Sequence, residues 1–348
     1  MTDVLFEGSA GQTILDVPFP PRVNANLSFA ERHLPEWLTR FDLLPGTSAR
    51  AHFASWRPVE LPGRWYPDAG REGLALGTDL FGWLMLLDDQ FDGPIGRRPE
   101  EVASVVDQLV LVIREPDSVP VESMFPAQAA LRDIWIRERE GMSATWRERA
   151  ARNWTDYLRS YVTEAENRSE GLLLSLPDYL VLRDTTGIMP VLLDSAERAG
   201  RYEVPPPLYQ SAELGEMYLL TVRVAGALND LLGLRKEEKL GDPHNIVPVL
   251  QREENLSRQQ ALDTASAMVR NWIDRFVELE RVIPAVNDRL GLAAGERTAG
   301  YLFIGDMRSA MRACYDWCAV SDRYSPESIV RLGENNCLHD ILTPGGDR

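Results

Sequence analysis

A run of acidic residues directly follows the most apolar segment of the chain. Residues 88–92 (DDQFD) come after residues 81–87 (FGWLMLL), which contain no polar side chain apart from the indole N–H of Trp83. On a helix, Asp88 and Asp92 would share one face, one turn apart, where two carboxylates repel each other. Carboxylate oxygens suit Mg²⁺, which also binds phosphate oxygens, so the run could hold this ion. The alternative interpretation is a buried helix that simply emerges into solvent at this end.

A second polar group stands at the end of another apolar segment. Residues 219–228 (LLTVRVAGAL) precede residues 229–237 (NDLLGLRKE). On a helix, Asn229, Gly233 and Glu237 would face one way, with about 12 Å of axial rise from the first to the last. Helical side chains lean toward the N-terminus, so the long Glu237 side chain can reach back toward Asn229. An amide oxygen and a carboxylate are therefore expected at the polar end of a second internal helix.

The charge of the chain restricts its partners. The formal net charge is −16 and no Lys- or Arg-rich run occurs, which argues against nucleic acid and anionic membranes. An acidic protein can still bind an anionic substrate when metal cations mediate the contact. No uncharged apolar stretch reaches the roughly 18 residues of a membrane span, the N-terminus has no basic segment before an apolar run, and three cysteines lack a CxxC pair. These features predict a cytoplasmic protein without membrane insertion.

Helical patterns must position both groups, because alternating strand patterns are nearly absent. We expect one all-α domain over residues 26–325, preceded by an extended, unpacked arm (1–25) and followed by a loosely ordered tail (326–348). A helix that is apolar all round, as around residues 81–87, belongs inside a large bundle. Loops with Pro, Gly or Asn delimit the expected helices, which are 29–43, 71–91, 99–113, 127–139, 143–164, 177–199, 211–239, 257–281 and 294–320.

The two groups resemble the metal-binding motifs of the bacterial class I terpene synthases, which are terpene cyclases. The aspartate-rich motif of that family, DDxx(x)D, matches residues 88–92. Its second motif, NDxx(S/T)xx(K/R)E, matches residues 229–237, including Lys236. The sequence departs from the pattern at Gly233, where the family has a Ser or Thr metal ligand. The aspartate-rich motif occurs once, whereas chain-elongating prenyl diphosphate synthases carry two, so the pattern favours cyclisation.

Two further features extend the resemblance over roughly residues 18–325. The family has an arginine that senses the diphosphate 46 positions before the Asn of the second motif, and Arg183 stands there. Thr186 and Gly187 then fall at the positions that the family calls linker and effector. Near the C-terminus, the Arg-Tyr pair of the family matches Arg323 and Tyr324.

The resemblance implies an all-α fold, a single large helical bundle of the class I terpenoid synthase type with a central active-site cavity. It implies three Mg²⁺ ions between the motifs, a linear isoprenyl diphosphate as substrate, and a homodimer. Asp88 and Asp92 would hold two ions, and Asn229 and Glu237 the third. Arg183, Lys236, Arg323 and Tyr324 would bind the diphosphate, and the carbonyl of Gly187 would approach the reacting carbon. Phe81, Leu84, Met85 and Trp317 would line the cavity, with ordinary core packing as the alternative for each.

The predicted reaction is the metal-dependent conversion of farnesyl diphosphate to a cyclic sesquiterpene plus diphosphate, which makes the protein a carbon–oxygen lyase. One alternative is a diterpene cyclase that acts on geranylgeranyl diphosphate. An alternative from a different class is an impaired diphosphate-binding protein, or a helical interaction protein whose acidic motifs lie on its surface. Burial separates these alternatives, because Asp88 and Asn229 at the mouth of one deep apolar pocket would fit the enzyme, whereas both on a convex surface would fit the interaction protein.

Overall fold

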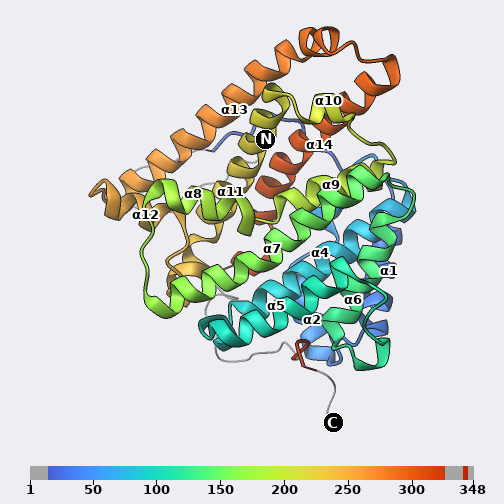
Figure 1. Ribbon diagram of the computed structural model, residues 1–348. Coiled ribbons are helices and arrows are strands. Elements are labelled where there is room, and N and C mark those ends of the chain that lie inside the picture. The colour runs from blue at the N-terminus through green and yellow to red at the C-terminus, as the bar shows by residue number, and fades with distance from the viewer. Residues whose placement is uncertain (1–14, 326–339, 344–348) are drawn as a thin grey trace. The chain divides into compact units, whose positions relative to one another are not determined.

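Helices make up all the regular structure of the residues that the computed structural model describes, 15–325 and 340–343 (Figure 1). This confirms the predicted all-α fold class. The α-helices are α1 (Leu27–Arg40), α2 (Thr47–Ser55), α3 (Glu60–Trp65), α4 (Arg71–Phe91), α5 (Pro99–Arg114), α6 (Pro126–Arg139), α7 (Ala144–Glu170), α8 (Leu176–Thr186), α9 (Met189–Gly200), α10 (Pro206–Tyr209), α11 (Ala212–Leu240), α12 (Ile246–Glu253), α13 (Arg258–Arg289) and α14 (Ala294–Cys318), and the 3₁₀ helices are η1 (Pro94–Arg97), η2 (Val121–Ser123) and η3 (Asp322–Tyr324).

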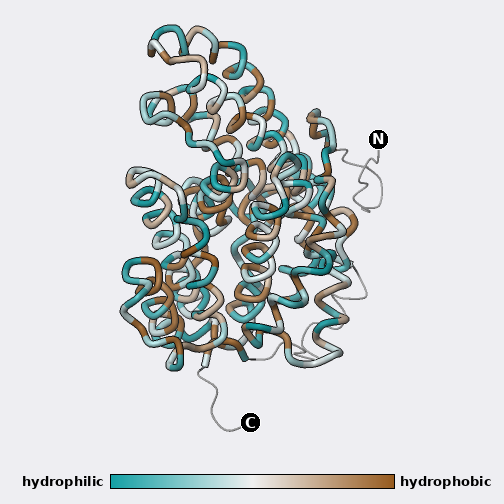
Figure 2. Tube along the Cα trace, turned by 90° about the vertical axis from the view of Figure 1, so that its right-hand side faces the viewer, coloured by the Kyte–Doolittle hydropathy of each residue, from teal (hydrophilic) through white to brown (hydrophobic). Residues whose placement is uncertain are grey.

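The chain separates into two compact units. Of the described residues, the α4 unit comprises 23–172, 190–201, 321–325 and 340–343, and the α11 unit comprises 15–22, 173–189 and 202–320. Hydrophobic and hydrophilic residues are interspersed along the helices of both units (Figure 2). The single domain expected over residues 26–325 stays a prediction.

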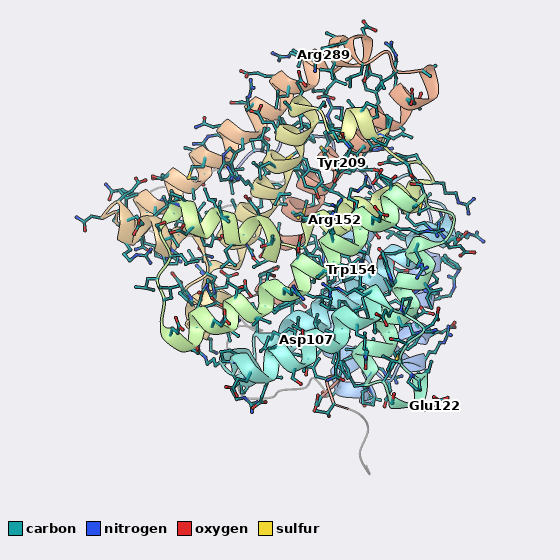
Figure 3. All side chains as sticks on the ribbon, in the orientation of Figure 1. Asp107, Glu122, Arg152, Trp154, Tyr209 and Arg289 are labelled. Carbon is teal, nitrogen blue, oxygen red and sulfur yellow. The ribbon has the colours of Figure 1, made fainter. Side chains whose placement is uncertain are left out.

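Helix α4 is the core of its unit. It packs against α1, α3 and α6, and α5 packs against α6 and α7. Every residue of α4 from Gly73 to Leu87 is buried, and the indole N–H of Trp83 donates to the carbonyl of Ala127 at 2.8 Å. A second indole, that of Trp154 on α7 (labelled in Figure 3), meets Trp83 edge-on with ring centroids 5.7 Å apart. The apolar pattern that predicted an internal helix is therefore confirmed.

A buried ion cluster also fixes α4 in its unit. Asp79 is fully buried and binds Nε2 of His33 on α1 and Nη2 of Arg137 on α6, each at 2.9 Å. A buried carboxylate is tolerated only when such partners compensate for its lost hydration. The cluster holds α1 and α6 against α4 nine residues before Asp88.

Helix α11 is the core of the other unit. It packs against α8, α12, α13 and α14, and in Figure 1 α13 (orange) lies beside α11 (yellow). Among the described residues, α11 is the helix that is long and apolar enough to cross a membrane, but 72% of its most apolar window is buried inside the protein. Such burial identifies α11 as a core helix.

The N-terminal arm is extended but packed, which corrects the expectation of an unpacked arm for its described part. Leu15, Val17 and Phe19 alternate with exposed residues and are buried. In an extended chain, alternate side chains face the same side, so three apolar residues can pack together. The ring of Phe19 meets that of Phe276 at 5.9 Å, and Nη1 of Arg312 donates to the carbonyl of Val17 at 3.0 Å.

Most of the expected C-terminal tail, 326–339 and 344–348, lies outside the described residues. The exception is residues 340–343, where Ile341 and Leu342 are buried. The carbonyl of Ile341 accepts a hydrogen bond of 3.0 Å from the N–H of Ala127 at the start of α6. These four residues are therefore held in the α4 unit rather than loose.

The expected helix over residues 177–199 is wrong, because it is two helices. Helix α8 ends at Thr186, α9 begins at Met189, and Ile188 between them has φ +56°. A β-branched residue seldom adopts this left-handed conformation, which costs on the order of 1–3 kcal/mol. Pro190 explains the break in part, since it lacks the N–H that a continuous helix would need there. The short helices α2, α3, α10 and α12 are additions to the prediction.

Candidate active site

The aspartate-rich group lies where α4 emerges from the core of the α4 unit. Asp88 and Asp89 are in the last turn of α4, and Asp92 is its C-terminal cap. Each of the three can place a carboxylate oxygen within 4.8 Å of the others. The side chain of Asp88 is 43% exposed and that of Asp89 is 14% exposed. Three converging hard oxygens fit a divalent cation such as Mg²⁺.

Arg323 neutralises part of this group within the same unit. Its Nη2 lies 2.6 Å from Oδ2 of Asp88 and 2.6 Å from Oδ1 of Asp89. Its guanidinium lies 5.3 Å from the ring centroid of Trp56, whose carbonyl accepts a hydrogen bond from Ser321 at 2.9 Å. Burial alone would lower the pKa of Arg323, but Asp89 and Asp88 hold that pKa well above its usual value. The arginine is therefore a permanent cation beside the carboxylates.

Arg183 is the corresponding arginine of the α11 unit. It projects from α8, and its Nη2 donates to Oδ1 of Asn229 at 2.7 Å and lies 2.8 Å from Oδ1 of Asp230. Gly226 on α11 gives it room, since a Cβ there would lie 3.3 Å from Cγ of Arg183. The 46-residue spacing in the sequence thus places Arg183 directly on the Asn of the second motif.

Asp230 is the buried centre of the second motif. Its side chain is fully buried and accepts hydrogen bonds from the hydroxyl of Tyr179 and, at 3.0 Å, from the N–H of Ile246. Burial raises the pKa of Asp230, while the Arg183 guanidinium and the Tyr179 hydroxyl oppose that shift. Asp230 therefore joins α8, α11 and the start of α12.

Glu237 lies two turns further along α11, on the face of Asn229. Its Oε2 accepts a hydrogen bond of 2.6 Å from Nδ2 of Asn245. Burial, and then the nearby Asp230, raise the pKa of Glu237 well above its usual value. A carboxyl in such surroundings gains from a bound cation, which would favour its ionised form. Gly233, between Asn229 and Glu237, is buried and offers no ligand atom.

Gly187 stands at the break after α8. Its N–H bonds the carbonyl of Arg183 at 3.3 Å, and a Cβ at this position would lie 3.3 Å from the same oxygen. The neighbouring hydroxyl Oγ1 of Thr186 is buried and has no hydrogen-bond partner among the described residues. Helix α8 thus ends directly before Gly187, the residue whose carbonyl the family resemblance predicts to approach the substrate.

With this geometry established, the chain can be compared with known proteins. Residues 79–275 match the family described as terpene synthase family 2, C-terminal metal binding. The chain belongs to this family. The match confirms the resemblance predicted from the motifs, and it covers both of them. This terpene synthase is therefore a class I enzyme, a carbon–oxygen lyase that acts on a diphosphate and cyclises its substrate.

Individual relatives agree with this assignment. The pentalenene synthase of Streptomyces arenae is 34% identical over 330 residues, which cover 93% of this chain and 96% of the relative. The (−)-β-caryophyllene synthase of Saccharothrix espanaensis is 34% identical over 338 residues, 96% of this chain and 95% of the relative. Among solved structures, that of a cucumene synthase variant is similar with a TM-score of 0.80 and 34% identity, covering 89% of this chain and 100% of that one.

The remaining predicted residues are mostly buried. Phe81, Leu84 and Met85 are buried on α4, and the ring of Phe81 contacts those of Trp65 and Tyr66 at 5.2 and 6.0 Å. In the α11 unit, Trp317 on α14 and Lys236 on α11 are buried. In the α4 unit, Tyr324 follows Arg323 in η3 and is half-buried. Their roles toward a substrate stay predictions.

Four residues of the site were not assigned a role from the sequence. Asp89 and Asp230 stand inside the motifs, so their positions alone gave a signal. Tyr179 had none, because it reaches Asp230 from a helix 51 residues earlier in the chain. Asn245 had none, because no periodic pattern marks a loop residue as the partner of Glu237. Asn245 directly follows His244, whose Nδ1 lies 2.9 Å from Oδ1 of Asp242 in the loop between α11 and α12.

Proposed function

We propose that this terpene cyclase converts farnesyl diphosphate to a cyclic sesquiterpene and diphosphate. The names of two relatives support the substrate, since the caryophyllene synthase and the 7-epi-α-eudesmol synthase of Streptomyces viridochromogenes are both described as cyclising (2E,6E)-farnesyl diphosphate. The single observation that carries the chemistry is the group of Asp88, Asp89 and Asp92 at the end of the buried helix α4.

The proposed cofactor is Mg²⁺, with three ions. Asp88 and Asp92, joined by Asp89, would hold two of them, and Asn229 and Glu237 would hold the third. These donors are all carboxylate or amide oxygens, which suit Mg²⁺ and leave room for waters and phosphate oxygens. When bound, the ions supply positive charge that stabilises the departing diphosphate.

Four donors of the chain are proposed to bind the diphosphate: Arg183, Lys236, Arg323 and Tyr324. The planar guanidinium of an arginine matches two phosphate oxygens at once. Arg323 and Arg183 now contact carboxylate or amide oxygens of the two motifs, so they would exchange these partners for the diphosphate. The carbonyl of Gly187 is proposed to face the reacting carbon. The break after α8 would leave this carbonyl outside the helix.

The hydrocarbon chain is proposed to contact Phe81, Leu84, Met85 and Trp317. The first three occupy the turns of α4 directly before Asp88, so they share the face that carries the diphosphate end. Aromatic faces stabilise a passing cation by about 0.5–2 kcal/mol, and apolar walls exclude water that would quench it. The family resemblance further suggests a cytoplasmic homodimer built from one domain over residues 26–325.

The test is incubation of the purified protein with geranyl, farnesyl or geranylgeranyl diphosphate, each with and without Mg²⁺, followed by gas chromatography–mass spectrometry. We expect a cyclic C15 hydrocarbon or alcohol from farnesyl diphosphate that disappears without metal. A cyclic C20 product instead would make the enzyme a diterpene cyclase. No product from any substrate would contradict the proposal and favour a protein that binds diphosphate without ionising it.

A further inference from the structure

Asn245 joins the two ends of the second motif in the α11 unit. It is fully buried at the junction between α11 and α12. Its Nδ2 donates to Oε2 of Glu237 at 2.6 Å and to the carbonyl of Asp230 at 2.8 Å. Because Asp230 and Glu237 are about 10 Å apart along the helix axis, this double contact requires that Glu237 bends back toward the N-terminus of α11.

The two ends of the Asn245 side chain have different roles. While Nδ2 contacts α11, Oδ1 accepts the N–H of Val247 at 2.8 Å and so caps the first turn of α12. The next residue, Ile246, donates its own N–H to Oδ2 of Asp230 at 3.0 Å. The start of α12 is thereby attached to α11 at two points, and the amide of Asn245 has one fixed orientation.

Without a hydrogen-bond donor such as Asn245, the Glu237 carboxylate could adopt several rotamers. Metal binding would then cost the conformational entropy of fixing one of them. A donor that holds one oxygen of a metal ligand fixes the ligand and tunes its basicity, and loss of such a donor typically lowers metal affinity about 10- to 100-fold. The amide of Asn245 is such a donor, because its Nδ2 contacts Oε2 of Glu237 at 2.6 Å while its Oδ1 is held by the N–H of Val247.

We propose that Asn245 is a positioning residue for the metal ligand Glu237, in addition to its role as a helix cap. The inference rests on the proposed role of Glu237 as a ligand. It deepens that role, because it assigns the orientation of the Glu237 side chain to a residue that lies outside both motifs.

The test compares three variants of the full chain. Asn245→Ser keeps an oxygen that can cap α12 but removes the Nδ2 donor, and Asn245→Ala removes both functions. Ser257→Ala is the matched control, because Ser257 caps α13 with its side chain and lies at the exposed start of that helix. The probe is Mg²⁺ titrated in the presence of inorganic pyrophosphate, read as the rise in Tm, and the Mg²⁺ concentration at half-maximal turnover is measured alongside.

We expect Asn245→Ser to raise the Mg²⁺ concentration at half-maximal effect about 10-fold or more in both measurements. Asn245→Ala should add a lower Tm to the same shift, and Ser257→Ala should lower the Tm while leaving the Mg²⁺ response unchanged. An unchanged Mg²⁺ response in Asn245→Ser would overturn the inference, as would an equal shift in Ser257→Ala.

The failure of the inference can be distinguished from the failure of the proposed function. If the wild-type protein makes no terpene from any isoprenyl diphosphate, the proposed function fails, but the pyrophosphate titration still measures the effect of Asn245. A wild-type Tm that does not respond to Mg²⁺ with pyrophosphate would overturn the inference itself, since Glu237 would then bind no metal.

Discussion

The motif at the end of α4 and the motif on α11 differ in how their charged side chains are surrounded. In the α4 unit, the carboxylates of Asp88, Asp89 and Asp92 converge within 4.8 Å, and Asp88 remains 43% exposed. In the α11 unit, Asp230 is fully buried and bonded to Tyr179, while Glu237 is bonded to Asn245. One group is a cluster of partly exposed carboxylates at a helix end that Arg323 contacts. The other is a network in which Arg183, Tyr179 and Asn245 surround the buried Asp230 and the neighbouring Glu237.

This difference shows that the two motifs depend on the fold to different degrees. The Asp88 side chain is 43% exposed, and Arg323 would keep Asp89 as a carboxylate partner if Asp88 lost its charge. Removing the Asp88 charge should therefore cost activity and little stability. A buried carboxylate has lost its hydration, so removing either it or its partner leaves an uncompensated charge. We therefore expect substitutions in the motif at the end of α4 to affect mainly catalysis. Substitutions in the motif on α11 should affect both stability and catalysis.

The largest expected effect is on turnover, at Asp88. Asp88→Asn keeps the shape of the side chain but removes a charged oxygen, and we expect kcat/KM to fall by about 10²- to 10³-fold, as when a group that stabilises transition-state charge is lost. The free energy of unfolding should change by less than about 0.5 kcal/mol. Asp107→Asn, at an exposed position of α5 labelled in Figure 3, is the control and should change neither quantity. Near-normal turnover in Asp88→Asn would remove the proposed metal role.

The next effect is on stability, at Asp230. Asp230→Asn leaves Arg183 without its ion pair in a buried setting, and we expect the free energy of unfolding in urea to fall by about 3 kcal/mol. The matched control is Asp184→Asn in the same unit, which breaks a half-buried pair with Arg223 (3.2 Å) and should cost less than about 1 kcal/mol. Equal losses in the two variants would contradict the claim that the burial of Asp230 makes its removal costly.

The third prediction concerns Glu138, a buried carboxyl outside both motifs. It tests whether burial by itself raises the pKa of a carboxyl and so makes the free energy of unfolding depend on pH. Glu138 is buried in the same unit as the exposed Asp88 and accepts hydrogen bonds from Ser195 and, at 2.9 Å, from the indole of Trp154. Burial raises the pKa of Glu138 from 4.5 to about 7. The folded state therefore holds this proton more tightly than the unfolded state does.

The stabilisation from Glu138 is complete below pH 4.5 and is lost as the pH rises to about 7. The loss amounts to about 3 kcal/mol over that interval. Glu138→Gln should remove this pH dependence from the free energy of unfolding, measured in urea at pH 4.5, 5.5 and 7. Parallel pH curves for the variant and the wild type would show that burial does not shift this carboxyl.

The smallest expected effect is at Gly233, where the α11 motif lacks a ligand atom. Gly233→Ser places a hydroxyl between Asn229 and Glu237, and we expect the Mg²⁺ concentration at half-maximal turnover to fall about fivefold, which corresponds to about 1 kcal/mol. Gly215→Ser, at an exposed glycine of the same helix with no atom within 4 Å of a new Cβ, is the control. No change in Gly233→Ser would indicate that this position contributes nothing to metal binding.

Much of the fold could be read from the sequence because its signals are local. The expected limits of α4, 71–91, are those observed, and the expected 211–239 differs from α11 by one residue at each end. Apolar periodicity and flanking Pro and Gly report on such helices directly. The helix over 177–199 was wrong because its apolar pattern continues through the break, although Gly187 and Pro190 were a signal that could have divided it.

The partners of the site were harder to predict, because hydrogen bonds between distant segments leave no periodic signal. The packing of Phe19 against Phe276 belongs to the same class, with its two rings contributed by segments far apart in the sequence of the α11 unit. Tyr179 and Asn245 reach the motif on α11 from α8 and from the start of α12. The residue type does not predict a hydrogen bond to the α11 motif in either case, since tyrosine and asparagine are common in helices and loops alike.

The sequence by itself determined the helical fold class, the terpene synthase family and the two motifs, because these depend on residue types at short, fixed spacings. Only the tertiary structure decided which groups compensate the charges. Arg323 lies on Asp88 although 235 residues separate them, and Tyr179 meets Asp230 across 51 residues. The physical reason is that desolvation is set by what packs around a side chain, and that packing exists only once helices distant along the chain have come together.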